Sequence, residues 1–305
     1  MCGLSGVRAV DAEALGLRRK DAGMTSAPGW TDVSLSPHVC GAGLGYRKEL
    51  SQEFSDHRDR VDVVEILADQ WFGDGNRERL SGIVDEFSTV VHGVGMSVGS
   101  AGRIPQEYLR DIRDIVRMCG ASYHSEHLAV THVPGMSSGH LCPPVISEES
   151  LRACIRNVEQ AQEFLGVPLA LENITYSMSL GGDHMAAASF FRDIVKATDC
   201  LILLDIANLY INSKNHRFDP LEYLDHLPIE RVVQIHLAGG VVSDSGKYID
   251  SHSEQVGLAI WELAAEVAKV VRPRSVIIER DQNFPDFTSL LEDAAKARGI
   301  FFPCV

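Results

Sequence analysis

The sequence predicts an α/β protein that folds as a (β/α)8 TIM-type barrel. Short apolar runs alternate with amphipathic segments about eight times over roughly 265 residues, which matches the size of such a barrel. Most of the apolar runs end in His, Asp or Glu, and barrel enzymes carry their catalytic groups at these strand ends. A doubly wound open sheet shows the same alternation and stays the alternative, because strand order cannot be read from one sequence.

The predicted domain organisation is a single barrel over residues 38–305, preceded by a short N-terminal arm over residues 1–37. The arm is rich in Gly, Ala, Ser and charged residues and shows no steady period. Such a composition is typical of loosely ordered chain, and one short helix is expected around residues 11–19. We find no linker and no internal repeat in the rest of the sequence.

The first half of the barrel is predicted from four apolar runs and two amphipathic segments. Strands are expected at residues 40–44, 61–66, 89–92 and 121–127. Helices are expected at residues 76–87 and 105–119, the second with Pro105 near its first turn, where proline is tolerated. Residues 133–144 contain many Gly and Pro and are predicted to form a loop.

The second half of the barrel repeats the same alternation. Strands are expected at residues 168–172, 201–205, 232–236 and 275–279. The run LILLD at 201–205 is almost wholly apolar, which indicates a strand buried on both faces. Helices are expected at residues 148–165, 185–198, 219–226, 253–270 and 285–298. Ser147 is placed to cap the first of these helices, and Gly166 is placed to end it.

The composition excludes several classes of protein. A formal net charge of -14 argues against a nucleic-acid binder, because phosphate contacts need Lys and Arg. No apolar run reaches the roughly 18 residues that a membrane span needs, and the N-terminus lacks the layout of a secretory signal, so a cytoplasmic protein is expected. The seven cysteines include no CxxC pair, which argues against a disulfide framework and against a zinc ribbon.

Polar side chains gather at the predicted ends of the strands and in the loops just beyond them. They are Glu65, His92, His127, Glu172 with Asn173, Asp205 with Asn208, His216, His236, Asp250 with His252, and Glu279 with Asp281. Carboxylates packed together repel one another unless a cation neutralises them. Mixed His and Asp/Glu ligands suit iron, manganese or zinc. About ten such groups exceed the four to six that one ion binds, so two or three metal ions are predicted.

The remaining polar residues divide into supporting acids and ordinary histidines. Glu65 and Glu126 are interpreted either as ligands or as acids that orient a ligand histidine. Four histidines are assigned to the surface or to loops: His124, His132, His140 and His184. The sequence has no phosphate-binding loop with its Lys-Ser/Thr, and no G-x-S-x-G nucleophile elbow.

With these residues in place, the sequence resembles the multinuclear non-haem iron-dependent oxidative enzymes, a family long known as a domain of unknown function. The resemblance runs in order from about residue 41 to residue 298. Its motifs are HGVGMSVGS at 92–100, SEHLA at 125–129, LEN at 171–173, LDIANLY at 204–210, NHRFDP at 215–220, IHLAGG at 235–240, IDSHS at 249–253 and IERD at 278–281. One departure is Glu126, because many members have Asp before this histidine.

The resemblance implies a TIM-type barrel that holds two or three iron ions and uses dioxygen. Members oxidise a residue, often Cys and sometimes Asp, in a ribosomally made precursor peptide, commonly together with a partner protein that recognises the peptide. Asp281 or Glu65 would then move protons, and Glu126, Asn173 and Arg280 would support the ligands or contact the substrate. Carried over by position, the iron ligands are His92, His127, Glu172, Asp205, Asn208, His216, His236, Asp250, His252 and Glu279.

Two other functions stay open at this point. One is a metal-dependent isomerase or hydrolase on the same type of barrel, in which Zn²⁺, Mn²⁺ or Mg²⁺ acts as a Lewis acid. The other is a protein that stores metal or binds a peptide without turnover. Consumption of dioxygen separates the oxidase from both alternatives.

Overall fold

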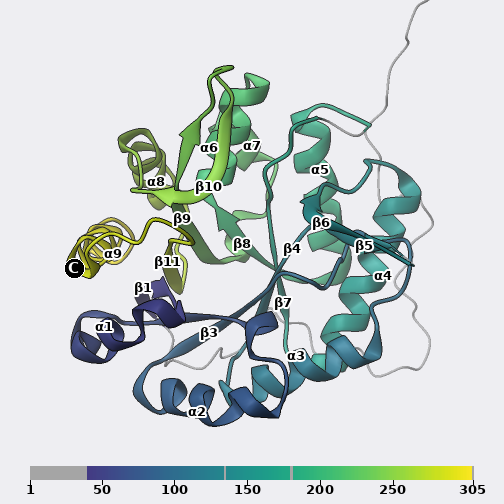
Figure 1. Ribbon diagram of the computed structural model, residues 1–305. Coiled ribbons are helices and arrows are strands. Elements are labelled where there is room, and N and C mark those ends of the chain that lie inside the picture. Colours follow the sequence, from purple (N-terminus) through teal and green to yellow (C-terminus); the bar gives the residue numbers. More distant parts are fainter. Residues whose placement is uncertain (1–39, 134, 179–180, 304–305) are drawn as a thin grey trace, which may run out of the picture.

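The computed structural model describes residues 40–133, 135–178 and 181–303, and these form a closed barrel of eight parallel strands. The strands follow one another around the barrel in the order β9-β11-β1-β2-β3-β4-β7-β8, and β8 pairs with β9 to close it (Figure 1). Their bounds are β1 Gly41–Gly45, β2 Val64–Leu67, β3 Thr89–Gly93, β4 His124–His127, β7 Leu169–Glu172, β8 Leu201–Asp205, β9 Val232–Val242 and β11 Ser275–Glu279. The closure confirms the predicted TIM-type barrel and excludes the open doubly wound sheet.

Helices surround the barrel in the described part of the chain (Figure 1). The α-helices are α1 Ser51–Asp56, α2 Arg77–Glu86, α3 Gln106–Met118, α4 Glu148–Leu165, α5 His184–Thr198, α6 Ile206–His216, α7 Pro220–Asp225, α8 Leu258–Val270 and α9 Phe287–Phe301. Short 3-10 turns are η2 Lys48–Leu50, η3 Arg58–Arg60, η4 Ala68–Trp71, η5 Asp74–Asn76 and η6 Ile229–Arg231. The predicted caps of α4 are present: the Ser147 side chain accepts from Ser150 N, and Gly166 has φ 76°.

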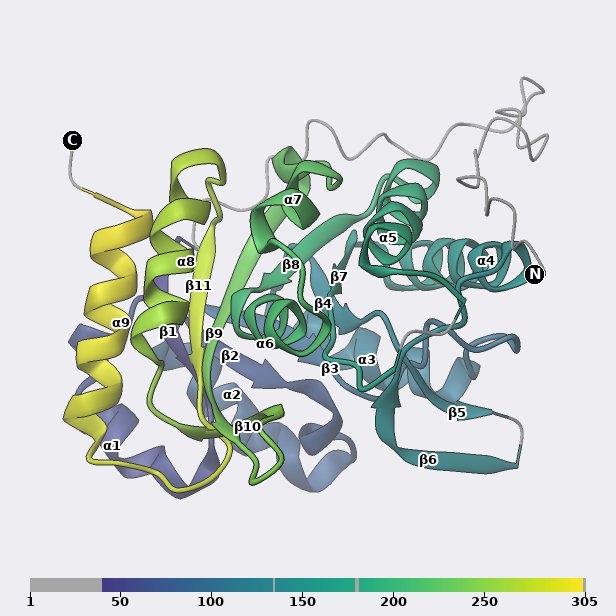
Figure 2. The same ribbon diagram turned by 90° about the horizontal axis from the view of Figure 1, so that it is seen from above.

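Two hairpins extend from the same end of the barrel (Figure 2). One joins β5 (Val130–Val133) to β6 (Met136–Cys142), and the other joins the long strand β9 to β10 (Tyr248–Glu254). The prediction of a loop over residues 133–144 was therefore wrong, and so was the start of a helix at residue 253. Both hairpins are rich in polar, partly exposed residues, so they lack the apolar alternation that reveals a strand in a sequence.

Helix α6 is a further difference from the sequence prediction, which had no helix here. It starts at Ile206, directly after β8, because the Asp205 carboxylate caps it by accepting a hydrogen bond from Asn208 N at 2.7 Å. Strand and helix thus meet without a loop. The predicted helix at residues 11–19 lies outside the described residues, as do Cys2 and Cys304. The five cysteines in the described part are free thiols.

The inside of the barrel is closed by a small apolar cluster, separate from the larger core between the sheet and the helices. Its members are Val63, Val90, Tyr123, Ala170, Leu201, Leu203, Val233 and Ile277. Because side chains on one face of a strand recur every second residue, this apolar layer determines what lies directly above it. None of the described helices is long and apolar enough to cross a membrane.

Candidate metal centre

The polar layer of the barrel lies two residues further along the strands than the apolar layer. The pairs are Val63 and Glu65, Val90 and His92, Ala170 and Glu172, Leu203 and Asp205, and Ile277 and Glu279. All five polar side chains are at most 6% exposed. The period of two thus directs a ring of acids and imidazoles into the barrel, above its apolar floor.

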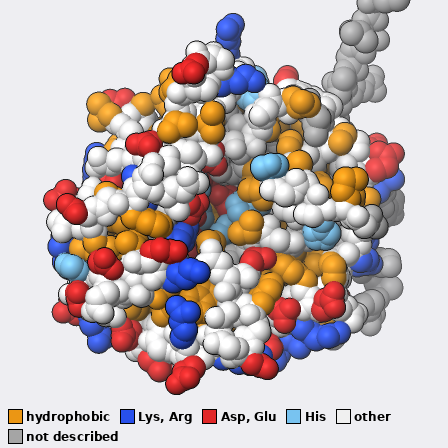
Figure 3. Space-filling view, in the orientation of Figure 1, with side chains coloured by type: hydrophobic (Ala, Val, Ile, Leu, Met, Phe, Trp, Pro, Cys, Tyr) orange, Lys and Arg blue, Asp and Glu red, His pale blue; other side chains and the backbone are white. Residues whose placement is uncertain are grey.

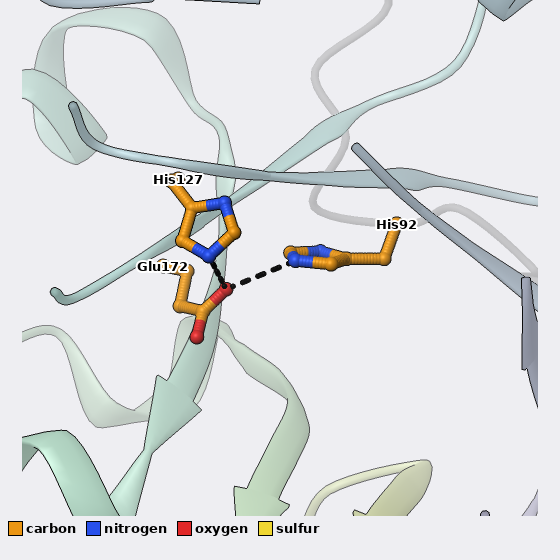
Figure 4. Close-up of side chains that lie close together, drawn as sticks. All are labelled: His92, His127 and Glu172. Carbon is orange, nitrogen blue, oxygen red and sulfur yellow. Dashed lines mark ion pairs between the residues drawn. The ribbon is translucent and has the colours of Figure 1, made fainter. Parts of the chain in front are cut away.

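The first group of candidate ligands is His92, His127 and Glu172 (Figure 4). Glu172 Oε2 lies 3.3 Å from His92 Nε2 and 3.2 Å from His127 Nε2. The opposite ring nitrogens are held in place: His92 Nδ1 donates to Ser125 Oγ at 3.0 Å, and His127 Nδ1 donates to the Gly93 carbonyl at 3.2 Å. Both Nε2 atoms therefore face the carboxylate. Burial would lower the pKa of His127, but Glu172 and Glu126 raise it to about 9, so a cation bound there would replace the proton on its Nε2.

The second group shares Glu172 with the first and adds Asp205, His236 and Glu279. One ligand atom from each of these four buried residues lies within 4.8 Å of the others. His236 Nδ1 is 3.0 Å from Glu279 Oε2 and 3.6 Å from Glu172 Oε1. Glu172 therefore faces one group with each oxygen, which is the position of a carboxylate that bridges two cations.

The hairpin strand β10 adds Asp250 and His252 at the edge of the second group. His252 Nε2 lies 2.8 Å from Asp250 Oδ1, and His252 Nδ1 lies 3.6 Å from Glu279 Oε2. Both residues were expected on a loop, but they belong to a strand. His252 has φ 48°, a strained backbone angle that recurs at functional sites. Its carbonyl accepts a hydrogen bond from Asp281 N at 2.9 Å, which fastens the hairpin to the end of β11.

Asn173 and Asn208 connect the ends of β7 and β8. The Asn173 side chain donates to the Asp205 carbonyl at 2.8 Å and accepts from Asp205 N at 3.0 Å. Asn208 donates to the Asn173 carbonyl at 3.1 Å, so its Oδ1 atom is left over and buried. Asn173 thus supports Asp205, whereas Asn208 offers an oxygen toward the same chamber.

Two predicted site residues, His216 and Arg280, contact groups outside the two ligand groups. His216, at the end of α6, places Nε2 2.8 Å from the Tyr176 carbonyl and stacks on the Tyr176 ring. Arg280 donates to the carbonyl of Asn283, in the turn that follows β11. Neither residue belongs to the two ligand groups, so their roles stay predictions.

The buried polar atoms test whether the site suits metal ions. Within the described residues, Asp205 Oδ2 and Asn208 Oδ1 have neither a hydrogen-bond nor an ion-pair partner. Four further atoms meet only other members of the ligand set: Glu172 Oε2, His236 Nδ1, Asp250 Oδ1 and His252 Nε2. Each unpaired buried group costs roughly 1–3 kcal/mol. Ligand atoms that share an ion at about 2.1 Å lie roughly 3 Å apart. The separations of 3.0 to 3.6 Å between the paired groups fit that arrangement.

The electrostatics of the ring also favour cations. Burial raises the pKa of Asp205 well above its usual value, and the charges of Glu172 and Asp250 raise it further. Burial alone would raise the pKa of Glu279, but His236 and His252 hold it well below the usual value. Without metal, the imidazolium groups of these two histidines compensate the carboxylates. A divalent cation would replace those protons and bind the same nitrogens.

A buried hydrogen-bonded chain supports His236 from below. Glu65 Oε2 accepts a hydrogen bond from His236 Nε2 at 2.8 Å and a second from the Gln234 side chain. Tyr123 OH donates to Gln234 Oε1 at 2.7 Å and also bonds Ser275 Oγ at 3.1 Å. Gln234 and Tyr123 were missed in the sequence. The signal for Gln234 was present, because it is the one polar residue inside the run VVQI at 232–235.

A second supporting chain reaches His252 from the side. The buried Arg47 guanidinium donates to Asp281 Oδ1, with Nε at 3.0 Å, and Asp281 Oδ2 lies 3.2 Å from His252 Nδ1. Burial would raise the pKa of Asp281, but His252 and Arg47 hold it below the usual value. Arg47 was also missed, because it follows β1 in sequence but meets Asp281 only when the barrel closes.

The four histidines assigned to the surface or to loops differ from one another. His140 is exposed, as expected, and His132 and His184 are half-buried. The assignment of His124 was wrong, because it begins strand β4 and has no exposed surface. Burial lowers the pKa of His124 to about 3, so it is a neutral core residue. Glu126, two residues on, accepts from the backbone N–H groups of Met96 and His127 and so holds the chain next to two candidate ligands.

Most of the candidate ligands line a chamber of about 230 Å³: His92, His127, Glu172, Asn208, Asp250, His252 and Glu279. In the space-filling view, histidine and acidic side chains are visible inside a central hollow (Figure 3). A second, apolar pocket adjoins the chamber at Ile174 and includes Leu128, Tyr176 and Phe190. The fold and this chamber define a class of protein: a TIM-type barrel enzyme with a candidate metal centre at the carboxyl ends of its strands.

Comparison with known proteins identifies the family within that class. Residues 41–301 match the family model described as "RiPP precursor modification enzyme MbnB/TglH/ChrH", where RiPP denotes a ribosomally synthesised and post-translationally modified peptide. The chain belongs to this family. The match agrees with the resemblance noted in the sequence, and it implies an enzyme whose substrate is a precursor peptide.

Curated relatives cover most of the chain. A UPF0276 protein of Caulobacter vibrioides is 36% identical over 265 residues, which cover 85% of this chain and 94% of the relative. A UPF0276 protein of Anaeromyxobacter sp. is 33% identical over 271 residues, covering 87% and 94%. A Streptomyces avermitilis UPF0276 protein is 34% identical over 254 residues, which are 81% of this chain but 52% of that relative.

Solved structures with the same fold are much more distant in sequence. A D-tagatose 3-epimerase-like protein superposes with a TM-score of 0.54 at 16% identity, covering 85% of this chain and 94% of that one. The IOLI protein with a bound zinc atom gives a TM-score of 0.52 at 13% identity, covering 88% and 97%. These similarities support the barrel fold alone.

Proposed function

We propose that the protein is a multinuclear non-haem iron- and dioxygen-dependent oxidase that modifies a residue, with Cys favoured, of a ribosomally synthesised precursor peptide. A partner protein that recognises the peptide is part of the proposal. One observation carries it: Glu172 lies between two ligand groups, so its two oxygens can serve two cations at once. Two-ion sites also occur in hydrolases, so the class of reaction is inferred from the family, which is described as RiPP precursor modification enzymes.

The proposed ligands divide between the two groups. His92, His127 and Glu172 would hold one ion, and Glu172, Asp205, His236 and Glu279 would hold a second. Asn208, Asp250 and His252 lie at the edge of the chamber, where they would complete the ligand set of the second ion or hold a third. When bound, iron supplies one-electron chemistry and reaction with dioxygen, which side chains alone do not supply.

The other residues of the chamber position groups and move protons. We assign proton transfer to Asp281, because it lines the chamber, contacts His252 and is 43% exposed to solvent. His252 and Arg47 lower the pKa of Asp281 and keep it ionised, so we assign it to passing a proton between substrate and solvent rather than to holding one. Glu65 lies below the chamber and holds the proton of His236 on Nε2, which leaves Nδ1 to bind a cation.

Metal analysis and oxygen uptake test the proposal. The protein would be purified without oxygen, analysed for iron, and mixed with each peptide encoded beside its gene, with neighbouring proteins co-expressed. We expect bound iron and oxygen consumption that depends on one peptide. Glu279→Gln should lose both metal and product, whereas the matched exposed variant Glu292→Gln on α9 should keep both. A preparation that holds no iron and leaves every such peptide unchanged would refute the oxidase.

The same experiment distinguishes the alternatives. Several structures with this fold carry the names of sugar epimerases or isomerases, at 11–17% identity. An isomerase or hydrolase would consume no dioxygen and would be activated by Zn²⁺, Mn²⁺ or Mg²⁺. A protein without turnover would lose metal in Glu279→Gln but would form no product in any variant.

A further inference from the structure

A cleft of about 650 Å³, distinct from the apolar pocket, lies beside the chamber that holds the candidate metal ligands, called the metal chamber below. Its walls come from the turns η2, η4 and η5, the start of α2, and the chain after β11. Arg47, Leu67 and Asp281 line both the cleft and the chamber, so the two spaces adjoin at the Arg47–Asp281 pair. The volume is in the range of small-ligand sites, which run from roughly 300 to 1,000 Å³.

The charge of this cleft is opposite to the charge of the protein. The whole chain carries a net charge of -14, yet Lys48 and Arg79 are both exposed on the cleft wall. Within the described residues, neither forms an ion pair. The acids of the wall are Glu49 and Asp281, and Asp281 is neutralised by Arg47. Basic side chains are also visible next to the central hollow in Figure 3.

The remaining wall of the cleft suits a peptide. Trp71 and Phe284 offer apolar surface, and the Arg79 guanidinium lies 5.8 Å from the centre of the Trp71 ring. Gln70 adds an exposed amide. A carboxylate that enters the chamber itself would meet Glu172 and Glu279, whereas one in the cleft would meet Lys48 and Arg79. The charges therefore favour a carboxylate in the cleft and disfavour one in the chamber, where oxidation would take place.

We propose that this cleft binds a carboxylate of the peptide substrate, carried by a residue near the one that enters the metal chamber, through Lys48 and Arg79. The proposal rests on the proposed function, because it assigns the substrate to a peptide. It adds that the peptide is acidic next to the modified residue. Two sources of the carboxylate share this chemistry: an acidic side chain and the C-terminus of the peptide.

The binding of short capped peptides tests the proposal without turnover. Three cysteine-free probes would be titrated into the metal-loaded protein without oxygen: acetyl-Gly-Glu-Glu-Gly-amide, acetyl-Gly-Gln-Gln-Gly with a free C-terminus, and the neutral acetyl-Gly-Gln-Gln-Gly-amide. Calorimetry gives the affinity. A change in tryptophan fluorescence that is lost in Trp71→Phe reports the location, because Trp71 lines the cleft and the chain has two other tryptophans. We expect one or both charged probes to bind more tightly than the neutral probe, and the first two probes separate the two sources.

Charge variants test whether Lys48 and Arg79 are the groups that bind the carboxylate. Lys48→Glu/Arg79→Glu should weaken binding of the charged probe by about tenfold, since two exposed ion pairs are lost. The milder Lys48→Gln/Arg79→Gln tests the same loss if the reversal disturbs folding. The control Arg110→Glu/Lys196→Glu changes the net charge by the same amount, at exposed positions on α3 and α5 outside the cleft lining, and should bind like wild type.

Two results would overturn the proposal. One is equal affinity for the charged and neutral probes, and the other is equal loss of affinity in the cleft variant and in its control. Either result leaves the oxidase untouched, because iron content and oxygen consumption are measured separately. Conversely, a protein that binds the acidic probe but holds no iron would keep the cleft and refute the oxidase.

Discussion

Glu65 Oε2 lies 2.8 Å from His236 Nε2, and both side chains are completely buried beneath the metal chamber. The carboxylate fixes the ring proton of His236 on the side away from the chamber, so Nδ1 faces Glu279 and Glu172. Gln234 and Tyr123 hold Glu65 in turn. The orientation of a candidate ligand is thus determined by buried residues beneath it.

Glu65→Gln should weaken metal binding without unfolding the barrel. The amide keeps the size of the side chain but no longer stabilises the proton on His236 Nε2, and loss of such a supporting contact typically lowers metal affinity by roughly 10–100-fold. Competition with a chelator of known affinity measures the change. Glu86→Gln, at an exposed position on α2, is the control. Equal affinities in the two variants would show that Glu65 does not position the ligand.

The barrel and most of the ring were predictable from the sequence, and the reason is local. Leu203 and Asp205 are two residues apart on one strand, as are Ile277 and Glu279, so an apolar run that ends in an acid already indicates what lies inside the barrel. The family model spans residues 41–301, a range that contains every motif of the series that suggested the family. Local pattern was sufficient wherever the strand itself positions the ligand.

Residues that act through distant partners could not be predicted in this way. Arg47 meets Asp281 across the closure of the barrel, 234 positions apart in sequence. His124 belongs to the core, yet its neighbours His127 and Glu126 made it resemble part of a polar segment. The two hairpins are polar and half-exposed, so neither shows the apolar alternation that reveals a strand in a sequence.

Glu172→Gln should remove metal from both groups, because both share this carboxylate. Substitution of Asp250, by comparison, touches the second group alone. We therefore expect the metal content of Glu172→Gln to fall below that of Asp250→Asn, as measured by elemental analysis after purification without oxygen. Glu163→Gln, exposed on α4, should retain the wild-type content. Glu172→Gln with undiminished metal would show that this residue does not bridge the two groups.

His124→Gln should reduce the sensitivity of the fold to acid. Burial lowers the pKa of His124 to about 3 in the folded protein, whereas the unfolded chain has about 6.5. As pH falls below 6.5, the unfolded state binds a proton that the folded state does not, so stability is lost. Between pH 7 and pH 5 this residue accounts for about 2 kcal/mol of the loss. Urea unfolding of the metal-free proteins at pH 7 and pH 5 measures the change. The free energy of unfolding should fall less in the variant than in wild type, and an equal fall would contradict the prediction.

Gly239→Ala should displace the hairpin that carries Asp250 and His252. A Cβ at Gly239 would lie 2.1 Å from the backbone carbonyl oxygen of Glu254, the last residue of β10. The strand must therefore move. We expect a loss of about 1–3 kcal/mol in the free energy of unfolding.

The same displacement should lower metal content, because it moves two candidate ligands away from Glu279. Gly82→Ala is the matched control: an added Cβ there meets nothing within 4 Å, and its position inside α2 should make alanine neutral or stabilising. Elemental analysis and urea unfolding would be measured on both variants. If Gly239→Ala lost stability but kept its full metal content, the hairpin would be structural and Asp250 and His252 would not be ligands.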